Sequence, residues 1–404
     1  MTDALTRTPR RHFLLWLLAV YGLARVVTTT VLLLVMRHQV PTGMTGGDAV
    51  PVDYFSFTAL WDGQWYQAIA LHGYPDILPV GASGAVEQNP WAFYPLFPYL
   101  AKAGMAVTGL GFPTVASTIA LLCGAGAAVL MGLLLRGRLG DPAAYLVVAL
   151  WASFPASVTL QLAYTESLAV LLLVGYLYAL SRERWLVATA VAVLVGLSRP
   201  IAVPLGVVTL VVVVIRWRAR AQRPVSRGEY ASMGAALVGC GVAGLLWPAV
   251  AWWRTGVSTA YTDTMASWRG DAKVEPFTPW LDKAHYYLGD TWGPVALVGL
   301  AVGLVALVAG PWARGLGADL RTWSLAYPAY LAAVLDPFTS IFRYLVPLFP
   351  LLVVVIGAGW ADRRGNGWRR LLWRAVPLLV LFIAGQYWWT DELWRFVPPS
   401  DYPP

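Results

Sequence analysis

Residues able to do chemistry are concentrated in one short segment, 61–74 (WDGQWYQAIALHGY), which follows the first apolar stretch. In this segment Asp62 lies among Trp61, Trp65 and Tyr66, with glutamines nearby. A carboxylate can act as a general base, and a setting of aromatic and amide side chains suits the binding of a sugar. We therefore expect Asp62 to be catalytic and Trp61, Trp65 and Tyr66 to bind substrate.

The composition places these residues in a membrane protein. Hydrophobic residues make up 58% of the 404 positions and charged residues only 12%, which excludes an ordinary soluble domain. A helix needs about 20 apolar residues to cross a hydrocarbon core of about 30 Å, and such stretches recur along the chain. We predict an all-α polytopic membrane protein with about 11 transmembrane helices, forming one transmembrane domain over residues 1–404.

Arginine clusters between the apolar stretches set the predicted topology. They begin with Arg7, Arg10 and Arg11, and because positive charge favours the cytoplasmic side, we expect the N-terminus in the cytoplasm. Two long loops, 37–90 and 254–290, then lie outside the cell membrane. The same clusters account for the net charge of +8, so no nucleic-acid partner is indicated.

The first external loop and the segment after it need a special arrangement. If segment 91–109 crossed the membrane fully, every later loop would change sides, so we expect it to be re-entrant or interfacial. The spacing of apolar residues predicts a short helix over 58–72 that lies on the membrane surface, with Asp62 and Tyr66 on a shared face. An ordinary alternative is that Asp62 only caps this helix.

Two further features have structural explanations. Arg25 interrupts the first apolar stretch, where a charge is costly unless it meets a partner or a wet cavity, or snorkels to the surface; we favour a structural role. Gly299 and Gly303 have the spacing of a close contact between two membrane helices.

Four motifs in the chain resemble those of a known family. They are 61–74, 92–98 (AFYPLFP), the pair 154–157 (FPAS) and 164–167 (YTES), and 343–350 (RYLVPLFP). With these motifs the chain resembles the PIG-V-like mannosyltransferases, relatives of GPI mannosyltransferase II in the GT-C class of integral-membrane glycosyltransferases. The resemblance covers most of the chain, and the first two motifs are specific in combination.

The resemblance implies a GT-C-like fold and a particular reaction. Mannose would move from a polyprenyl-phosphate-mannose donor to an acceptor hydroxyl at the extracytoplasmic face, with inversion, and Asp62 stands where the family carries its basic loop carboxylate. The chain departs from eukaryotic relatives at 63–65, which leaves the acceptor open among a glycolipid, a glycan and a protein. A glycosyl phosphate has a good leaving group, so one carboxylate acting as a base suffices.

Positive charge is needed where the phosphate departs. Arg199 and Arg343 are the candidates, because both are predicted at external helix ends and a guanidinium binds phosphate bidentately. Each could equally be a snorkelling anchor, and Asp336 could account for Arg343. Glu166, at the start of a predicted helix, either interacts with the helix dipole or binds the sugar.

The remaining candidates near the predicted base are His72 and Trp91. His72 can hydrogen-bond a substrate, although a lone histidine on such a helix is more often structural. Most tryptophans fit an interfacial belt, but we expect Trp91, with Trp61 and Trp65, to lie beside the proposed base. We predict no required metal or cofactor; a divalent ion held by Asp48, Asp53 and Asp62 is the weaker possibility.

Two other functional classes fit the same composition. A lipid-linked sugar transporter or flippase would place polar residues at the membrane midplane, whereas the informative polar residues here are predicted on one side. A non-catalytic membrane scaffold would bind lipid without turnover, and only an activity measurement separates it from an enzyme.

Overall fold

The structure, a computed structural model, describes residues 8–43, 52–269, 274–360, 367–398 and 404. Within these ranges the regular secondary structure is helical, apart from one isolated antiparallel bridge between Val80 and Val86, and turns and irregular segments connect the helices. The α-helices in chain order are α1 (Arg10–Met36), α2 (Tyr54–Phe57), α3 (Asp62–His72), α4 (Leu96–Thr108), α5 (Phe112–Leu139), α6 (Asp141–Ser153), α7 (Glu166–Ser181), α8 (Trp185–Gly196), α9 (Ala202–Arg218), α10 (Arg227–Thr255), α11 (Ala260–Ser267), α12 (Thr278–Ala309), α13 (Gly317–Val334), α14 (Ile341–Tyr344), α15 (Phe349–Val355) and α16 (Trp368–Trp389). A 3-10 segment, η3 (Pro155–Gln161), follows α6, and a π-helical turn, η8 (Thr390–Trp394), follows α16.

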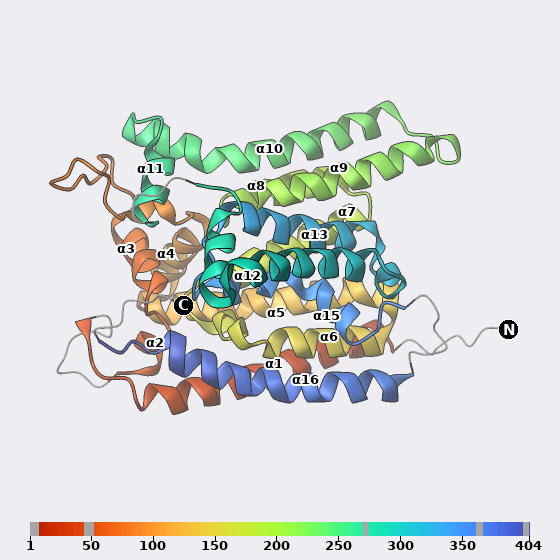
Figure 1. Cartoon of the computed structure of the whole chain (residues 1–404), viewed down its shortest axis with the longest axis horizontal. Coiled ribbons are helices and arrows are strands. Elements are labelled where there is room, and N and C mark those ends of the chain that lie inside the picture. Colours follow the sequence, from red (N-terminus) through yellow and green to blue (C-terminus); the bar gives the residue numbers. More distant parts are fainter. Residues whose placement is uncertain (1–7, 44–51, 270–273, 361–366, 399–403) are drawn as a thin grey trace.

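Six of the described helices are long and apolar enough to cross a membrane, namely α1, α5, α9, α10, α12 and α16 with their short extensions. The pair α6 and η3, bent by 85° at its break, makes a seventh if it is one span. α7, α8 and the segment Ile341–Val355 are shorter apolar helices, and α13 lies among them (Figure 1). The chain is therefore a multi-pass membrane protein. The expected number of about 11 crossings stays a prediction.

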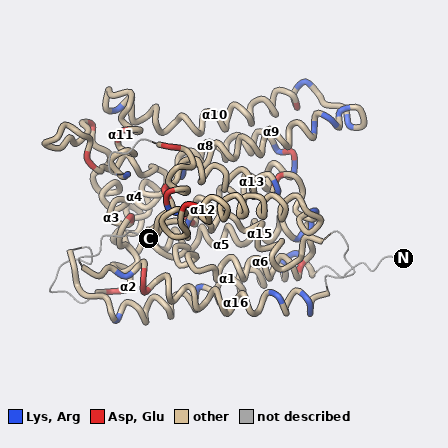
Figure 2. Tube along the Cα trace, in the orientation of Figure 1, with Lys and Arg blue, Asp and Glu red and all other residues tan. Residues whose placement is uncertain are grey.

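The long helices run side by side, and the short helices gather at one end of them (Figure 1). That end carries α2, α3, α4 and α11, and the N-terminal end of α1 lies at the opposite end. Lysine and arginine residues gather mainly at the N-terminal end of the bundle (Figure 2). The molecule thus has one basic end and one end built from short helices.

The segment expected to be re-entrant or interfacial is a short helix at the second of these ends. α4 has 13 residues, which gives a length of about 20 Å and is too short for a hydrocarbon core of about 30 Å. It packs against α3 and α5. Its C-terminus is closed by Gly109, whose φ of 72° lies in the left-handed region that glycine adopts without strain.

The predicted surface helix begins at Asp62, a few residues later than expected. It buries the face formed by Gly63, Tyr66, Ile69 and Ala70, while His72 at its end is exposed. This face is buried because it joins an apolar cluster with residues of α4 and α5. The face that carries Tyr66, which also includes Asp62, is therefore the one that turns towards the protein interior.

Small residues allow the closest helix contacts. A side-chain carbon added at Gly196 of α8 would overlap the backbone of Ala243 in α10. By contrast, Gly299 and Gly303 have no other part of the described chain within 4 Å of such a carbon, so these glycines make no close helix contact within the described chain. Spacing alone identifies small residues, but only the packing of the helices decides which of them face a neighbour.

Arg25 has partners inside the bundle and does not snorkel. Its guanidinium donates hydrogen bonds to the carbonyl oxygens of Ser157, at 2.8 Å, and Ala152. Ala152 lies in the last turn of α6, where carbonyls have no partner within the helix, and an unpaired carbonyl is costly in a membrane. Gln386 adds bonds to the carbonyls of Ala152 and Phe154, both at 3.3 Å.

Candidate functional site

The site begins with a constrained turn before α3. Trp61 has φ 56° and ψ −121°, a conformation that costs a non-glycine residue free energy and must be held by its surroundings. Its buried indole N–H donates to the carbonyl oxygen of Trp394 at 2.7 Å, and its ring meets that of Phe396 edge-on at 5.2 Å. This anchor fixes the direction in which the next residue, Asp62, leaves the turn.

Asp62 faces an arginine from a distant part of the chain. Arg343 Nη1 donates to Asp62 Oδ2 at 2.5 Å and lies 3.4 Å from Glu166 Oε1. Arg199 binds the same Glu166 oxygen. The four side chains form one continuous chain of ion pairs, which we call the charged cluster: Asp62, Arg343, Glu166 and Arg199.

Each member of the charged cluster comes from a helix end. Asp62 is the first residue of α3 and Glu166 the first of α7. Arg199 lies in the link between α8 and α9, where Pro200 prevents the helix from continuing. Arg343 lies on the short helix α14, close to Pro347. Helix ends, and not helix middles, therefore bring the charges together.

Burial makes the charged cluster unusual. The exposed fractions of the side chains are 13% for Asp62, 2% for Glu166, 8% for Arg343 and 10% for Arg199. Buried charges require partners, and here the negative and positive charges balance. Asp62 is the carboxylate that retains the greater access to solvent.

Tyrosines surround the charges. The Tyr164 hydroxyl accepts a hydrogen bond from the backbone N–H of Asp62 at 3.1 Å, and its ring lies 5.3 Å from the Arg343 guanidinium. Tyr344 lies 5.0 Å from the Arg199 guanidinium and 5.5 Å from that of Arg343. Burial, and then the charges of Glu166 and Asp62, raise the pKa of Tyr66 well above its usual value, so this hydroxyl stays protonated.

Several polar atoms at the charged cluster have no partner within the described residues. They are Thr165 Oγ1, Glu166 Oε2, Ser167 Oγ, Ser198 Oγ and Arg343 Nε. Nearly all buried polar atoms in folded proteins are hydrogen-bonded to protein, water or ligand. Their concentration on the segments that carry Glu166, Arg199 and Arg343 marks a place able to hold a polar ligand.

These contacts distinguish between the alternative roles considered for Asp62, Arg343 and Arg199 in the sequence analysis. The residue that caps α3 is Trp61, without a side-chain hydrogen bond, so Asp62 does not serve as an N-cap. Arg343 pairs with Asp62 and Glu166 instead of Asp336, and neither Arg343 nor Arg199 snorkels. Tyr164 and Tyr344 were not among the predicted site residues, although each lies within two positions of one that was.

The other predicted substrate-binding residues lie outside the charged cluster. Trp65 is half-buried and stacks on Phe93 at 5.7 Å, with Trp268 edge-on at 5.3 Å. Trp91 is fully buried, and its indole N–H donates to the carbonyl of Pro75 at 3.0 Å. The roles of Trp65, Trp91 and His72 in substrate binding stay predictions.

The carboxylates proposed for a divalent ion are engaged separately. Asp53 caps α2 by accepting from the N–H groups of Phe55 and Ser56, whereas Asp62 pairs with Arg343. Asp48 lies outside the described residues. No group of three or more His, Cys, Asp or Glu side chains suited to a metal occurs in the part of the chain that the structure describes.

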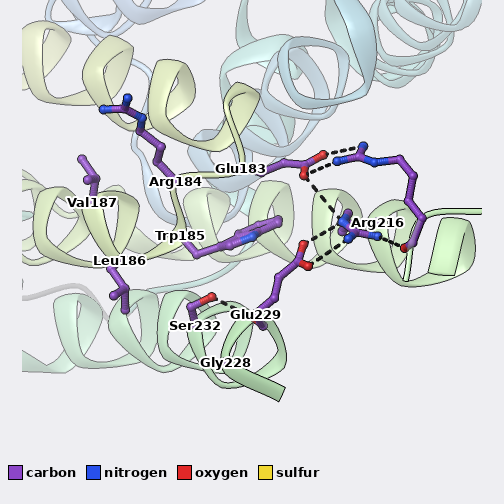
Figure 3. Close-up of a pocket in the computed structure, with 10 residues that line it drawn as sticks. Glu183, Arg184, Trp185, Leu186, Val187, Arg216, Gly228, Glu229 and Ser232 are labelled. Carbon is purple, nitrogen blue, oxygen red and sulfur yellow. Dashed lines mark hydrogen bonds and ion pairs between the residues drawn. The ribbon is translucent and has the colours of Figure 1, made fainter. Parts of the chain in front are cut away.

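Two cavities lie elsewhere in the molecule. One, of about 610 Å³, lies between the ends of α8, α9 and α10, where Arg216 binds Glu229 at 2.7 Å and Arg223 binds Glu183 at 2.7 Å (Figure 3). These ion pairs join the helix ends. The other cavity, of about 440 Å³, lies between α1, α2 and α5. The charged cluster lines neither of them.

Fold and site together define an all-helical, multi-pass membrane protein with a buried charged cluster near one end of its bundle. The chain is similar to the crystal structure of ArnT from Cupriavidus metallidurans bound to undecaprenyl phosphate, with a TM-score of 0.52 and 14% identity over 93% of this chain and 76% of that one. This likeness confirms the predicted all-α, GT-C-like fold.

Two further solved structures show weaker likenesses. They are ArnT from the same organism in the apo state, with a TM-score of 0.49 and 16% identity over 93% of this chain and 75% of that one, and the Archaeoglobus fulgidus oligosaccharyltransferase in complex with Zn and sulfate, with a TM-score of 0.49 and 14% identity over 95% and 54%. No protein-family model and no curated protein matches the sequence.

Proposed function

We propose that this protein is an inverting membrane glycosyltransferase that moves mannose from a polyprenyl-phosphate-mannose donor to an acceptor hydroxyl. The observation that carries the proposal is the charged cluster, in which Asp62, Glu166, Arg199 and Arg343 meet although they come from separate segments. The shared fold with ArnT, a protein crystallised with undecaprenyl phosphate, supports a lipid-linked donor. The sugar is assigned on the resemblance to PIG-V-like proteins.

In this reaction Asp62 is the general base. The acceptor oxygen forms a bond to the anomeric carbon, the bond from that carbon to the phosphate oxygen breaks, and Asp62 takes the acceptor proton. The polyprenyl phosphate leaves with the bonding electrons. The access of Asp62 to solvent, greater than that of Glu166, supports giving the base role to Asp62.

The arginines receive the donor phosphate. Arg343 donates to Asp62 Oδ2 at 2.5 Å, so the base is paired with a cation. A donor phosphate offers Arg343 a bidentate partner, whereas Asp62 is bound through Nη1. Binding of the donor would therefore draw Arg343 towards the phosphate and release Asp62 for the acceptor. This exchange links the activation of the base to the presence of the donor.

The proposed site lies at the extracytoplasmic face of the cell membrane. Lysine and arginine gather mainly at the N-terminal end of the bundle, and positive charge favours the cytoplasm (Figure 2). α3 lies at the other end (Figure 1). A polyprenyl chain would then lie along the apolar helices, with its sugar near Asp62.

The test is transfer of radiolabelled mannose by purified protein in lipid nanodiscs. With polyprenyl-phosphate-mannose as donor, Asp62→Asn should lower kcat by about 100-fold or more, because amide cannot accept the proton. The matched control is Asp76→Asn, a carboxylate of the same loop whose Arg254 pair is exposed to solvent and which should retain activity.

The outcomes separate the proposal from its competitors. Full activity of Asp62→Asn would exclude this residue as the base. Lipid binding without any turnover by the wild-type protein would indicate a scaffold, and movement of the intact lipid-linked sugar across a vesicle would indicate a transporter. Use of GDP-mannose by the pure protein would exclude the lipid-linked donor.

A further inference from the structure

A second polar region lies within the bundle, at the cavity of about 440 Å³ between α1, α2, α5 and η3. Residues from this region take no part in the charged cluster. The polar residues that line it are Arg25, Thr29, Thr30, Tyr54, Ser117, Thr118 and Gln161. Val26, Phe55 and Leu121 form its apolar lining, and the exposed sides of Val26 and Leu121 open towards the lipid.

The cavity is lined by a buried cation without an anionic partner in the described chain. Arg25 is 5% exposed, and it forms no ion pair within the described residues. Two of its nitrogens bind backbone carbonyls, but Arg25 Nε has no partner among those residues. A charge buried inside a membrane protein is costly unless a counter-charge or water compensates it. The carbonyls of Ser157 and Ala152 carry only partial charges, so an anion is the missing partner.

The neighbouring side chains offer further donors. Gln161 Nε2 donates to the Thr29 hydroxyl at 3.0 Å and to the Tyr54 hydroxyl at 2.9 Å. Because both hydroxyls accept from Gln161, their own protons remain for another acceptor. Arg25 Nε, Thr29 and Tyr54 therefore provide three donors at one cavity, which suits the oxygens of a phosphate.

The side-chain amide of Gln161 also lacks a hydrogen-bond donor for its oxygen within the described residues. Gln161 Oε1 is buried and has no partner in the described part of the chain, so it can accept a hydrogen bond from the ligand. A phosphate alone offers few donors, whereas a phosphodiester with a glycerol headgroup offers both acceptor oxygens and donor hydroxyls. The headgroup chemistry that satisfies all these atoms is that of an anionic phospholipid.

The position of the cavity also favours a lipid. The cavity lies near the end of the bundle that carries the short helices, because Tyr54 and Phe55 belong to α2 and Ser117 lies five residues after the start of α5 at Phe112. That distance is about 8 Å along the helix, a depth that a lipid headgroup can reach. Val26 on α1 and Leu121 on α5, which line the cavity, have exposed fractions of 62% and 37% and provide apolar surface for acyl chains. We propose that this cavity binds the headgroup of an anionic phospholipid, with Arg25 as its charged anchor.

The experiment measures lipid binding and not transfer of sugar. A negative result would therefore not contradict the proposed transferase activity. Wild-type protein in phosphatidylcholine nanodiscs is titrated with phosphatidylglycerol, and bound lipid is counted by native mass spectrometry while the Tm is recorded. We expect retained phosphatidylglycerol and a rise in Tm. Arg25→Gln should weaken retention about tenfold or more, because it removes the charge while keeping one amide donor.

A pair of variants separates lipid binding from the structural role of Arg25. Leu121→Trp fills the cavity without removing any bond of Arg25, and it should weaken phosphatidylglycerol binding as Arg25→Gln does. Leu122→Trp, one residue later on α5 and outside the lining, should bind as the wild type does. If Arg25→Gln fails to fold, the comparison of Leu121→Trp with Leu122→Trp still shows whether the cavity binds phosphatidylglycerol.

Three results would overturn the inference. The first is equal retention of phosphatidylglycerol by Leu121→Trp and Leu122→Trp. The second is no preference of the wild type for phosphatidylglycerol over phosphatidylcholine. The third is the same rise in Tm with inorganic phosphate alone, which would assign the cavity to a free anion instead of a lipid.

Discussion

At the scale of the residue, Arg343 holds the central position in the charged cluster. Its Nη1 contacts both carboxylates, Asp62 at 2.5 Å and Glu166 at 3.4 Å, while Arg199 supports Glu166 from the other side. Removing Arg343 would leave Asp62 and Glu166 without this cation, which is strongly destabilising for buried charges. Arg199 can compensate only for Glu166. The effect of Arg343 on catalysis is therefore best tested with a substitution that keeps its positive charge.

Arg343→Lys is such a substitution. Lysine keeps one positive charge but lacks the planar fork that binds phosphate bidentately, so the KM for the polyprenyl-phosphate donor should rise about tenfold. Steady-state kinetics with varied donor checks this, and the KM for the acceptor is the internal control. An unchanged donor KM in a folded variant would limit Arg343 to structural pairing.

At the scale of the element, close helix contacts depend on a few glycines. α8 approaches α10 so closely that a methyl group at Gly196 would overlap the backbone of Ala243, which cannot move as a side chain can. Gly241, on α10, has no atom of the described chain within 4 Å of an added methyl group. The two glycines therefore separate the effect of packing from that of helix propensity.

Gly196→Ala should lower the stability of the protein by about 1–3 kcal/mol, as overpacking does in other cores. Gly241→Ala should be neutral or raise it by about 0.5–1 kcal/mol, because alanine favours a helix more than glycine does. Thermal unfolding in one detergent compares the two. Equal Tm values for both variants would contradict the close contact of α8 with α10.

At the scale of the whole molecule, the two ends of the bundle differ in charge and in structure. The basic end carries the ion pairs of Arg216 and Arg223, and the other end carries α3 and the charged cluster (Figures 2 and 3). An enzyme that takes a polyprenyl donor from one leaflet needs only one such site. The orientation of the bundle therefore decides which compartment supplies the acceptor.

Single cysteines report this orientation. In a variant without Cys123 and Cys240, Ser83→Cys lies on the first loop and Ser181→Cys at the end of α7, and both positions are exposed. A membrane-impermeant maleimide added to intact cells should label position 83 and leave position 181 unlabelled until the cells are lysed. The reverse pattern would place Asp62 in the cytoplasm and would overturn the proposed compartment.

Composition and charge pattern were enough to predict the class of the protein and the residues able to do chemistry. Hydropathy is a local property, so apolar spans could be predicted from it, and the non-spanning segment at 91–109 followed from the sides on which the arginine clusters must lie. Asp62, Glu166, Arg199 and Arg343 were likewise candidates, since each is a charged residue at a predicted helix end or loop.

The contacts of those residues depend on the folded arrangement of the chain. Asp62 and Arg343 are 281 positions apart, and nothing local indicates that they form an ion pair. The carbonyls that hold Arg25, the anchor of Trp61 on Trp394 and the glycines that face a neighbouring helix were equally hidden. The physical reason is that membrane helices form as separate units, and their partners are chosen by shape and polar contacts between distant segments, which a one-dimensional pattern does not contain.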